Sequence, residues 1–111
     1  MNEADGVIDL RTYKLMPGSG EAFGGILRQD ALPLLRRFGI SVVAHGASLD
    51  DPDVYYLARS FGSTQERNQS LDAFYGSAEW RQHHRDTVLA LIESFHVLLL
   101  PAAPNGLPLA G

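Results

Sequence analysis

The stretch ISVVAHGASLDDPDVYYLARS, residues 40–60, decides the fold of this 111-residue chain. Residues 40–47 and 54–60 are rich in β-branched and aromatic side chains, which favour strands. Between them stands the run DDPD, residues 50–53, which is typical of a turn. We therefore expect two strands joined as a hairpin in the middle of the chain.

The segment before the hairpin has the pattern of a helix. Between residues 21 and 38, apolar side chains recur at steps of three and four, which is the period of an amphipathic helix. Pro33 lies inside this pattern and removes one backbone hydrogen bond, so we expect a kink at residues 30–33. Gly39 is placed to end the helix in the left-handed conformation.

The segment after the hairpin also predicts helical structure. Ser63 and Glu66 have the spacing of a capping box, which opens a helix that runs to Tyr75. Ser77 can cap the next helix, because apolar residues then continue on one helical face as far as Leu91.

Two outer strands complete the pattern. Residues 7–15 (VIDLRTYKL) nearly alternate in character and stop at the turn-forming run MPGSG, residues 16–20. Residues 95–100 (FHVLLL) form the last strand, which Pro101 closes. The order strand, helix, strand, strand, helix, strand predicts an α+β, ferredoxin-like βαββαβ fold, in which helices cover one face of an antiparallel four-stranded sheet.

Length and composition limit the classes of function. A chain of 111 residues has room for one domain, which we expect at residues 7–101 between a disordered N-terminus at 1–6 and an extended C-terminal tail at 102–111. The net charge of −4, with no run of Lys or Arg, argues against nucleic-acid binding. The lack of cysteine excludes disulfides, thiol catalysis and cysteine metal sites. No export signal or membrane span is visible, so we expect a cytoplasmic protein without a membrane partner.

The strands are apolar on both faces, although helices can cover only one face of such a sheet. In the last strand, His96, Leu98 and Leu100 share one face, and Phe95, Val97 and Leu99 share the other. An uncovered apolar sheet face has the size of an interaction site. We therefore expect a symmetric homodimer.

Three segments together resemble the NIPSNAP family. LRTYKLMPG (10–18) is similar to the family's opening R-x-Y strand and Pro-Gly turn, and LPLLRRFGI (32–40) to its proline-containing helix end. YYLARSFGSTQERNQSLDAFYGSAEW (55–80) is similar in its strand end and in its later E-R, A-F and E-W pairs. The likeness covers roughly residues 7–101.

The resemblance implies a dimeric α/β barrel, in which two ferredoxin-like domains join their sheets back to back. That superfamily includes cofactor-independent monooxygenases, haem-degrading oxygenases, dismutating enzymes, and cyclases or isomerases of small metabolites. Their pockets lie between the sheet and the helices. Because one fold hosts many functions, the resemblance does not fix the reaction.

Arg11 and Tyr13 share one face of the first strand and match the family's R-x-Y. A buried arginine must be paired and a buried phenol seeks a partner, so they could hold an anionic or carbonyl group of a ligand. The alternative is that Arg11 pairs internally with a carboxylate such as Asp9 or Glu66. Arg59 and Tyr55, both in the third strand, are weaker candidates of the same kind.

The histidines supply candidates for acid and base catalysis. His84 shares a helical face with Trp80, so it is either an acid/base group at a pocket wall or a helix-face residue without a catalytic role. His45 either faces a pocket or lies at the dimer interface, and His96 competes for both roles. His83 and His84 are adjacent and point about 100° apart on a helix, so they cannot chelate one metal together. Any single histidine could ligate a haem.

Aromatic residues at helical spacing could wall a pocket or belong to the core. They are Phe23, Phe74, Tyr75 and Trp80. The Gly-rich fragments at 18–20 and 24–25 lack the spacing of a nucleotide-binding loop, and we expect neither a cofactor nor a metal.

Two functions remain open from the sequence. The first is a small-molecule binder or cofactor-independent enzyme acting on an aromatic or polyketide-like metabolite. In it, His84, His45 and Tyr13 would be catalytic, and Arg11, Tyr55, Arg59, Phe74 and Trp80 would bind the substrate. The second is a non-catalytic interaction or stress-associated protein, which predicts a closed and filled space between sheet and helices.

Overall fold

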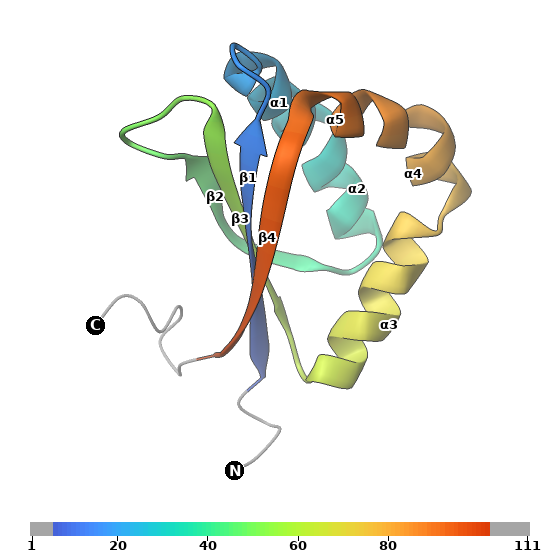
Figure 1. Cartoon of the computed structure of the whole chain (residues 1–111). Helices are drawn as coiled ribbons and strands as arrows, with labels where there is room; N and C mark the ends of the chain where they lie inside the picture. The colour runs from blue at the N-terminus through green and yellow to red at the C-terminus, as the bar shows by residue number, and fades with distance from the viewer. Residues whose placement is uncertain (1–5, 103–111) are drawn as a thin grey trace.

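The computed structural model describes residues 6–102 and confirms the α+β, ferredoxin-like fold. Figure 1 shows one antiparallel sheet, in the order β2-β3-β1-β4, with the helices on one of its faces. The elements are β1 (Val7–Leu15), α1 (Gly20–Ile26), the π-helical turn η2 (Leu27–Ala31), α2 (Leu32–Arg37), β2 (Ser41–Ala47), β3 (Val54–Phe61), α3 (Thr64–Tyr75), α4 (Ala78–His83), α5 (Arg85–Leu91) and β4 (Ile92–Pro101).

The predicted ends of the chain lie outside the described residues, apart from Gly6 and Ala102. These two residues are joined, because the Ala102 backbone N–H donates to the Gly6 carbonyl at 3.2 Å. Between them, no helix has both the length and the hydropathy needed to cross a bilayer.

Strand β1 is central and pairs on both sides, with β3 and with β4. Its odd-numbered residues, among them Asp9, Arg11 and Tyr13, face the helices, because Tyr13 lies opposite the core-lining Tyr55. Its even-numbered residues face away, so that Leu10 is paired with Leu98 on the open face of the sheet. The polar residues of β1 that matter for a site are therefore all on the helix side.

The predicted kink at Pro33 takes the form of a π-helical turn. Leu32 donates its N–H to the Leu27 carbonyl, five residues back, before α2 begins. Pro33 then stands in the first turn of α2, which continues directly from η2, and its missing N–H interrupts the regular helical hydrogen-bond pattern at this point. Gly39 adopts a φ of 75° and ends the helix as predicted.

The helix expected to continue from Ser77 to Leu91 is interrupted. Ser77 caps α4 by accepting the Trp80 N–H at 3.2 Å, but the chain leaves helical geometry at His84, with φ −131° and ψ −32°. A new helix, α5, then starts at Arg85. Neither a glycine nor a proline marks this break, so the sequence pattern could not predict it.

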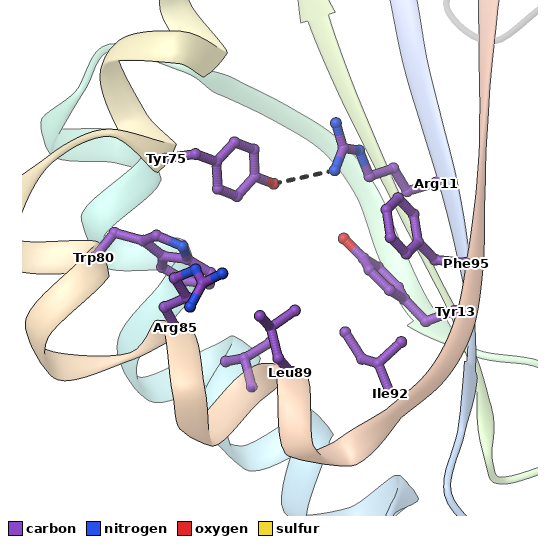
Figure 2. A pocket seen from close by; sticks show the side chains of 9 residues that line it. Arg11, Tyr13, Tyr75, Trp80, Arg85, Leu89, Ile92 and Phe95 are labelled. Carbon is purple, nitrogen blue, oxygen red and sulfur yellow. Dashed lines mark hydrogen bonds between the residues drawn. The ribbon is translucent and has the colours of Figure 1, made fainter.

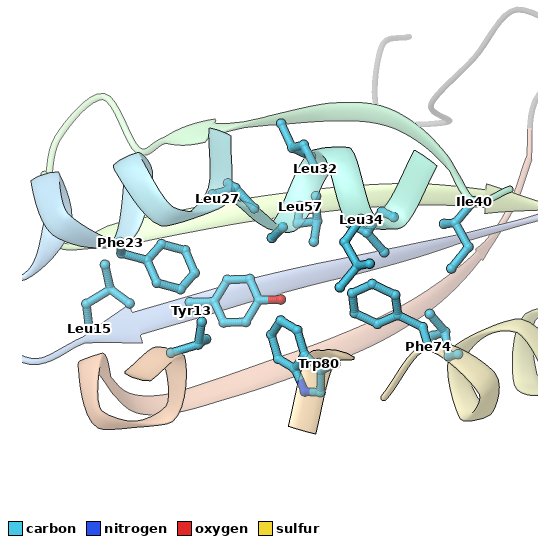
Figure 3. Packing of buried hydrophobic residues seen from close by; sticks show 14 of the residues in the cluster. Tyr13, Leu15, Phe23, Leu27, Leu32, Leu34, Ile40, Leu57, Phe74 and Trp80 are labelled. Atoms are coloured by element: carbon cyan, nitrogen blue, oxygen red, sulfur yellow. The ribbon is translucent and has the colours of Figure 1, made fainter. Parts of the chain in front are cut away.

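The core lies between the sheet and the helices, as Figure 3 shows. Phe74 is almost fully buried, and its ring lies 5.2 Å from that of Trp80 and 5.5 Å from that of Phe38. The Tyr13 ring is 5.1 Å from Phe23, which connects β1 to α1. Aromatic side chains thus join the sheet to α1 and join the end of α2 to α3 and α4.

The β2–β3 hairpin is fixed to the start of α1 by Asp53. Its carboxylate accepts the N–H groups of Gly18 and Gly20, at 2.9 and 2.8 Å. The start of α1 lies so close to the hairpin loop that a side chain at Gly20 would overlap the backbone carbonyl of Pro52. In contrast, a Cβ at Gly25, in the same helix, would meet open space.

These two glycines give a matched test of the junction. We expect Gly20→Ala to lower the free energy of unfolding by about 1–3 kcal/mol, because backbone atoms must move apart. Gly25→Ala should raise the free energy of unfolding by about 0.5–1 kcal/mol, since alanine reduces the conformational entropy of the unfolded chain. Urea denaturation measures both, and equal effects at the two positions would contradict the close packing at Gly20.

Candidate functional site

A buried carboxylate organises the polar part of the site. Asp9, on β1, has no exposed surface and faces three guanidinium groups. Its Oδ1 accepts from Arg11 Nε at 3.2 Å and from Arg59 Nη2 at 3.3 Å. Its Oδ2 accepts from Arg67 Nε at 2.9 Å and Nη2 at 2.7 Å. The internal pairing of Arg11 with Asp9, one of the two alternatives from the sequence, is therefore present.

The charges around Asp9 determine its ionisation. Burial alone would raise the pKa of the carboxyl, but the charges of Arg59 and Arg11 and the hydrogen bond from Arg67 outweigh burial. The pKa of Asp9 consequently lies below its usual range, and the group is ionised at neutral pH. Three guanidiniums around one carboxylate leave the cluster with two excess positive charges.

Tyr75, at the end of α3, connects this cluster to a pocket. Its hydroxyl oxygen accepts from Arg59 Nη1 at 3.0 Å and, through a longer contact of 3.4 Å, from Arg11 Nη1. The Arg11 guanidinium also lies 5.4 Å from the centre of the Tyr75 ring, and 5.8 Å from that of Phe95. The Arg11 side chain is thereby held between two aromatic rings.

The pocket has a volume of about 270 Å³ and opens between the sheet and the C-terminal helices. Figure 2 shows its walls, in which β1 and β4 form one side and α4 and α5 the other. Its lining is mostly apolar, with a few polar groups at one end, as is usual for ligand sites. The lining residues are Arg11, Tyr13, Tyr75, Trp80, Arg85, Val88, Leu89, Ile92 and Phe95.

Tyr13 presents its hydroxyl to this pocket. The side chain is only 8% exposed, and within residues 6–102 no group forms a hydrogen bond with its hydroxyl. Burial, and after it the neighbouring Tyr75, raise the pKa of the phenol, although Arg59 and Arg11 act in the opposite direction. Tyr13 therefore stays protonated at any physiological pH and can donate a hydrogen bond.

A smaller cavity of about 40 Å³ lies behind the pocket and shares Tyr13, Tyr75, Trp80 and Val88 with it. Arg59 lines this inner cavity, and its Nε is buried without a hydrogen-bond partner among the described residues. A volume of this size accommodates about one water molecule or one small substituent.

The structure brings together some of the residues predicted from the sequence. Arg11, Tyr13 and Trp80 line the pocket, and Arg59 and Phe74 line the inner cavity behind it. Tyr55 lies elsewhere, because its hydroxyl packs against Gly24 of α1, where a Cβ would overlap it.

The histidines lie outside the lining of the pocket. His84 is half-buried at the break between α4 and α5, with its ring 6.1 Å from that of Trp80. His45 is exposed on the edge strand β2, opposite Leu57 and thus on the helix side. His96 is exposed on the open face, opposite Thr12. His83 is exposed.

A β-bulge in strand β2 changes which of its residues face the helices. The register shifts between Val42 and Ala44, so Val42 and His45 both lie on the helix side and Val43 is the exposed extra residue. Strict alternation along the strand predicts that Val43 lies on the same face as His45. Bulges break strict alternation, which is why the pattern was wrong there.

Sequence reasoning missed several functional side chains. Arg67 was not selected, although it lies four and eight residues before Leu71 and Tyr75 on one face of α3, a spacing that could have revealed it. Tyr75 was expected only as part of an aromatic wall. Arg85, Leu89 and Phe95 join the pocket because of the turn at His84 and the course of β4, for which the sequence carried no signal.

No group of three metal-ligating side chains comes together among residues 6–102.

Comparison with known proteins identifies the class of fold. No family model matches the sequence, and no curated protein matches it. Solved structures do match: a NIPSNAP-like domain protein from Burkholderia xenovorans has a TM-score of 0.83 at 13% identity, over 95% of this chain and 91% of that one. A NIPSNAP family protein of unknown function from Agrobacterium tumefaciens has a TM-score of 0.82 at 16% identity, over 92% of each chain.

A more distant match is a putative antibiotic biosynthesis monooxygenase from Bacteroides thetaiotaomicron, with a TM-score of 0.66 at 12% identity over 93% of this chain and 92% of that one. The protein thus shares its ferredoxin-like fold with these solved structures. Within that class, its fold is that of the NIPSNAP proteins, so the resemblance noted in the sequence is confirmed at the level of the fold.

The Asp9 cluster predicts a specific dependence of stability on pH. Asp9→Asn should lower the free energy of unfolding by about 3–5 kcal/mol at pH 7, because it leaves buried guanidiniums uncompensated. Since the pKa of Asp9 is depressed in the folded state, its contribution is complete above about pH 4 and is lost as the pH falls toward the folded pKa. Urea denaturation at pH 7, 5, 4 and 3 should show the difference between the two proteins narrowing below pH 4.

Asp30→Asn, at an exposed position of η2, is the matched control and should leave stability nearly unchanged. A loss for Asp9→Asn that is small, or that is the same at every pH, would contradict the described ionisation of the cluster.

Proposed function

We propose that this chain is a NIPSNAP-type protein that binds a small, largely apolar molecule in the pocket between its sheet and its C-terminal helices. The observation that carries the proposal is the pocket itself: an apolar lining that ends in Tyr13, Tyr75 and Arg11. The non-catalytic alternative predicts a filled space at this place. A volume of about 270 Å³ favours binding instead and suits a molecule of one or two rings.

The lining of the pocket supports binding more directly than catalysis. Among the described residues that line it, there is no carboxylate and no imidazole, and the Tyr13 phenol is protonated. A reaction that starts with proton removal would therefore need a base from elsewhere, such as the half-buried His84 after a movement of its side chain. The likeness to a putative monooxygenase keeps cofactor-independent oxygenation, isomerisation or cyclisation as the enzymatic form of this proposal.

Binding can be tested with indane, a neutral two-ring hydrocarbon. Trp80 is the only tryptophan of the chain and lines the pocket, so its indole N–H gives one resolved signal in a ¹⁵N-correlated NMR spectrum. We expect indane to shift this signal in a saturable manner. Leu89→Phe should weaken binding about 10-fold or more, because the added ring occupies space at the mouth of the pocket.

Ala90→Phe is the matched control, because it adds the same side-chain ring on α5 about 100° away from Leu89, at an exposed position outside the lining. Binding by this variant should equal that of the parent protein. A Trp80 signal that does not respond to indane, or equal losses in both variants, would refute the proposed pocket.

We also propose that the protein is a homodimer whose two sheets meet through their open faces. Leu98 is 57% exposed on β4 and is paired with Leu10, while Leu100 pairs with Ile8 on the same face. The half-buried Tyr56 of β3, paired with Thr12, lies on the same face. A second copy can cover such a surface by presenting the same residues, which is the arrangement of a two-fold interface.

The dimer predicts that a charge at the centre of the open face prevents association. Leu98→Glu should convert a species with twice the mass of one chain into a monomer, as measured by light scattering after size exclusion. Leu49→Glu makes the same change at a fully exposed position of the β2–β3 loop and should remain a dimer. A monomeric parent protein at micromolar concentration, or a dimeric Leu98→Glu variant, would disprove this interface.

A further inference from the structure

The polar groups at the pocket all donate hydrogen bonds. Besides the phenols of Tyr13 and Tyr75, the lining contains the guanidiniums of Arg11 and Arg85 and the indole N–H of Trp80. Guanidinium and indole groups cannot accept a hydrogen bond at all. A ligand that fills the pocket therefore gains most from acceptors, since among these groups only the Tyr13 oxygen is left free by the described residues to accept a hydrogen bond.

The two phenols are positioned to act together. Figure 2 shows the hydroxyl groups of Tyr13 and Tyr75 both pointing into the pocket. The Tyr75 oxygen already accepts from Arg59 and Arg11, so only its O–H is left, and none of residues 6–102 accepts it. Tyr13, nine-tenths buried, likewise has no partner for its O–H among these residues. Tyr75 is half-buried, and both O–H groups remain free to donate to a ligand in the pocket.

The charge around these donors is positive. Asp9 neutralises only one of the three arginines that surround it, and its two oxygens are fully occupied by them. Arg11 belongs to both the cluster and the pocket, and its Nη2 has no partner among the described residues. Arg85, at the opposite wall, is paired with Asp86 at 3.2 Å on the exposed surface, so the excess charge comes from the Asp9 cluster. The pocket thus has an unbalanced positive potential beside an apolar surface.

We propose that the pocket selects a small apolar ring compound that carries an oxyanion, whose oxygen accepts from Tyr13 and Tyr75 and whose charge is balanced by Arg11. The oxyanion can be a carboxylate or a phenolate or enolate oxygen, because each presents acceptors only. The inference rests on the proposed binding function and adds the chemical class of the ligand.

The arrangement is preorganised for this role. Arg59 and Arg11 donate to the Tyr75 oxygen and polarise its O–H, which strengthens the hydrogen bond that it can give. The raised pKa of Tyr13 keeps its proton available at any physiological pH. The apolar walls formed by Val88, Leu89 and Ile92 reduce the competition from water.

The test compares probes of one shape and different charge, using the Trp80 indole signal at pH 7. We expect indane-2-carboxylate to bind at least 10-fold more tightly than neutral indane, and the cationic 2-aminoindane at least 10-fold more weakly. Titration with 2,4-dinitrophenolate, which is fully ionised at pH 7, then distinguishes a phenolate from a carboxylate preference, and tighter binding of either anion than of indane supports the proposal.

Tyr13→Phe is the decisive variant, because it removes only a hydroxyl without a described partner and should fold normally. It should weaken indane-2-carboxylate binding about 10-fold and change indane binding less than about 2-fold. Tyr55→Phe removes a phenol outside the pocket and should affect neither probe.

The outcomes separate the two levels of the proposal. If indane binds but neither anion binds more tightly, or if Tyr13→Phe weakens both probes equally, the oxyanion site is wrong while the apolar pocket stands. If no probe moves the Trp80 signal, the proposed binding function itself fails.

Discussion

The carboxylate of Asp9 is the group on which the polar half of this molecule depends. It is fully buried on the central strand and receives four hydrogen bonds from three arginines, which come from β1, β3 and α3. Without it, Arg59 would be a buried cation with no counter-ion, a costly state. Because α3 is held to the sheet through Arg67, the same carboxylate also helps to position Tyr75 at the end of that helix.

The pocket begins where the network of Asp9 and its arginines ends, at Tyr75. On one side of Tyr75 the side chains are ionic and gathered around Asp9, and on the other side they are aromatic and aliphatic. Tyr75 and Tyr13 stand at this boundary, with oxygens toward the charges and rings toward the core. A phenol suits such a boundary, since its body is apolar and its tip is polar. The resulting site is rich in donors and deficient in acceptors, which limits the ligands it can favour.

The sequence predicted most of the architecture because its signals are local. The hairpin turn, the caps at Ser63 and Ser77, the end at Gly39 and the interruption at Pro33 each arise from a few neighbouring residues. Prediction was less successful where tertiary contacts determine the local backbone conformation. The break at His84 has no glycine or proline to announce it, and the bulge in β2 shifts the face of Val43 without a signal in the sequence.

The sequence by itself determined the order of strands and helices, the apolar character of both sheet faces and the placement of Arg11 and Tyr13 on one face of the first strand, since periodicity and turn chemistry act over a few residues. Only the tertiary structure decided which side chains form the site. Asp9 meets Arg59 and Arg67 across 50 and 58 residues of chain, and Arg11 meets Tyr75 across 64. The pairing of strands brings these residues together, and no local pattern encodes which partner a buried charge will find.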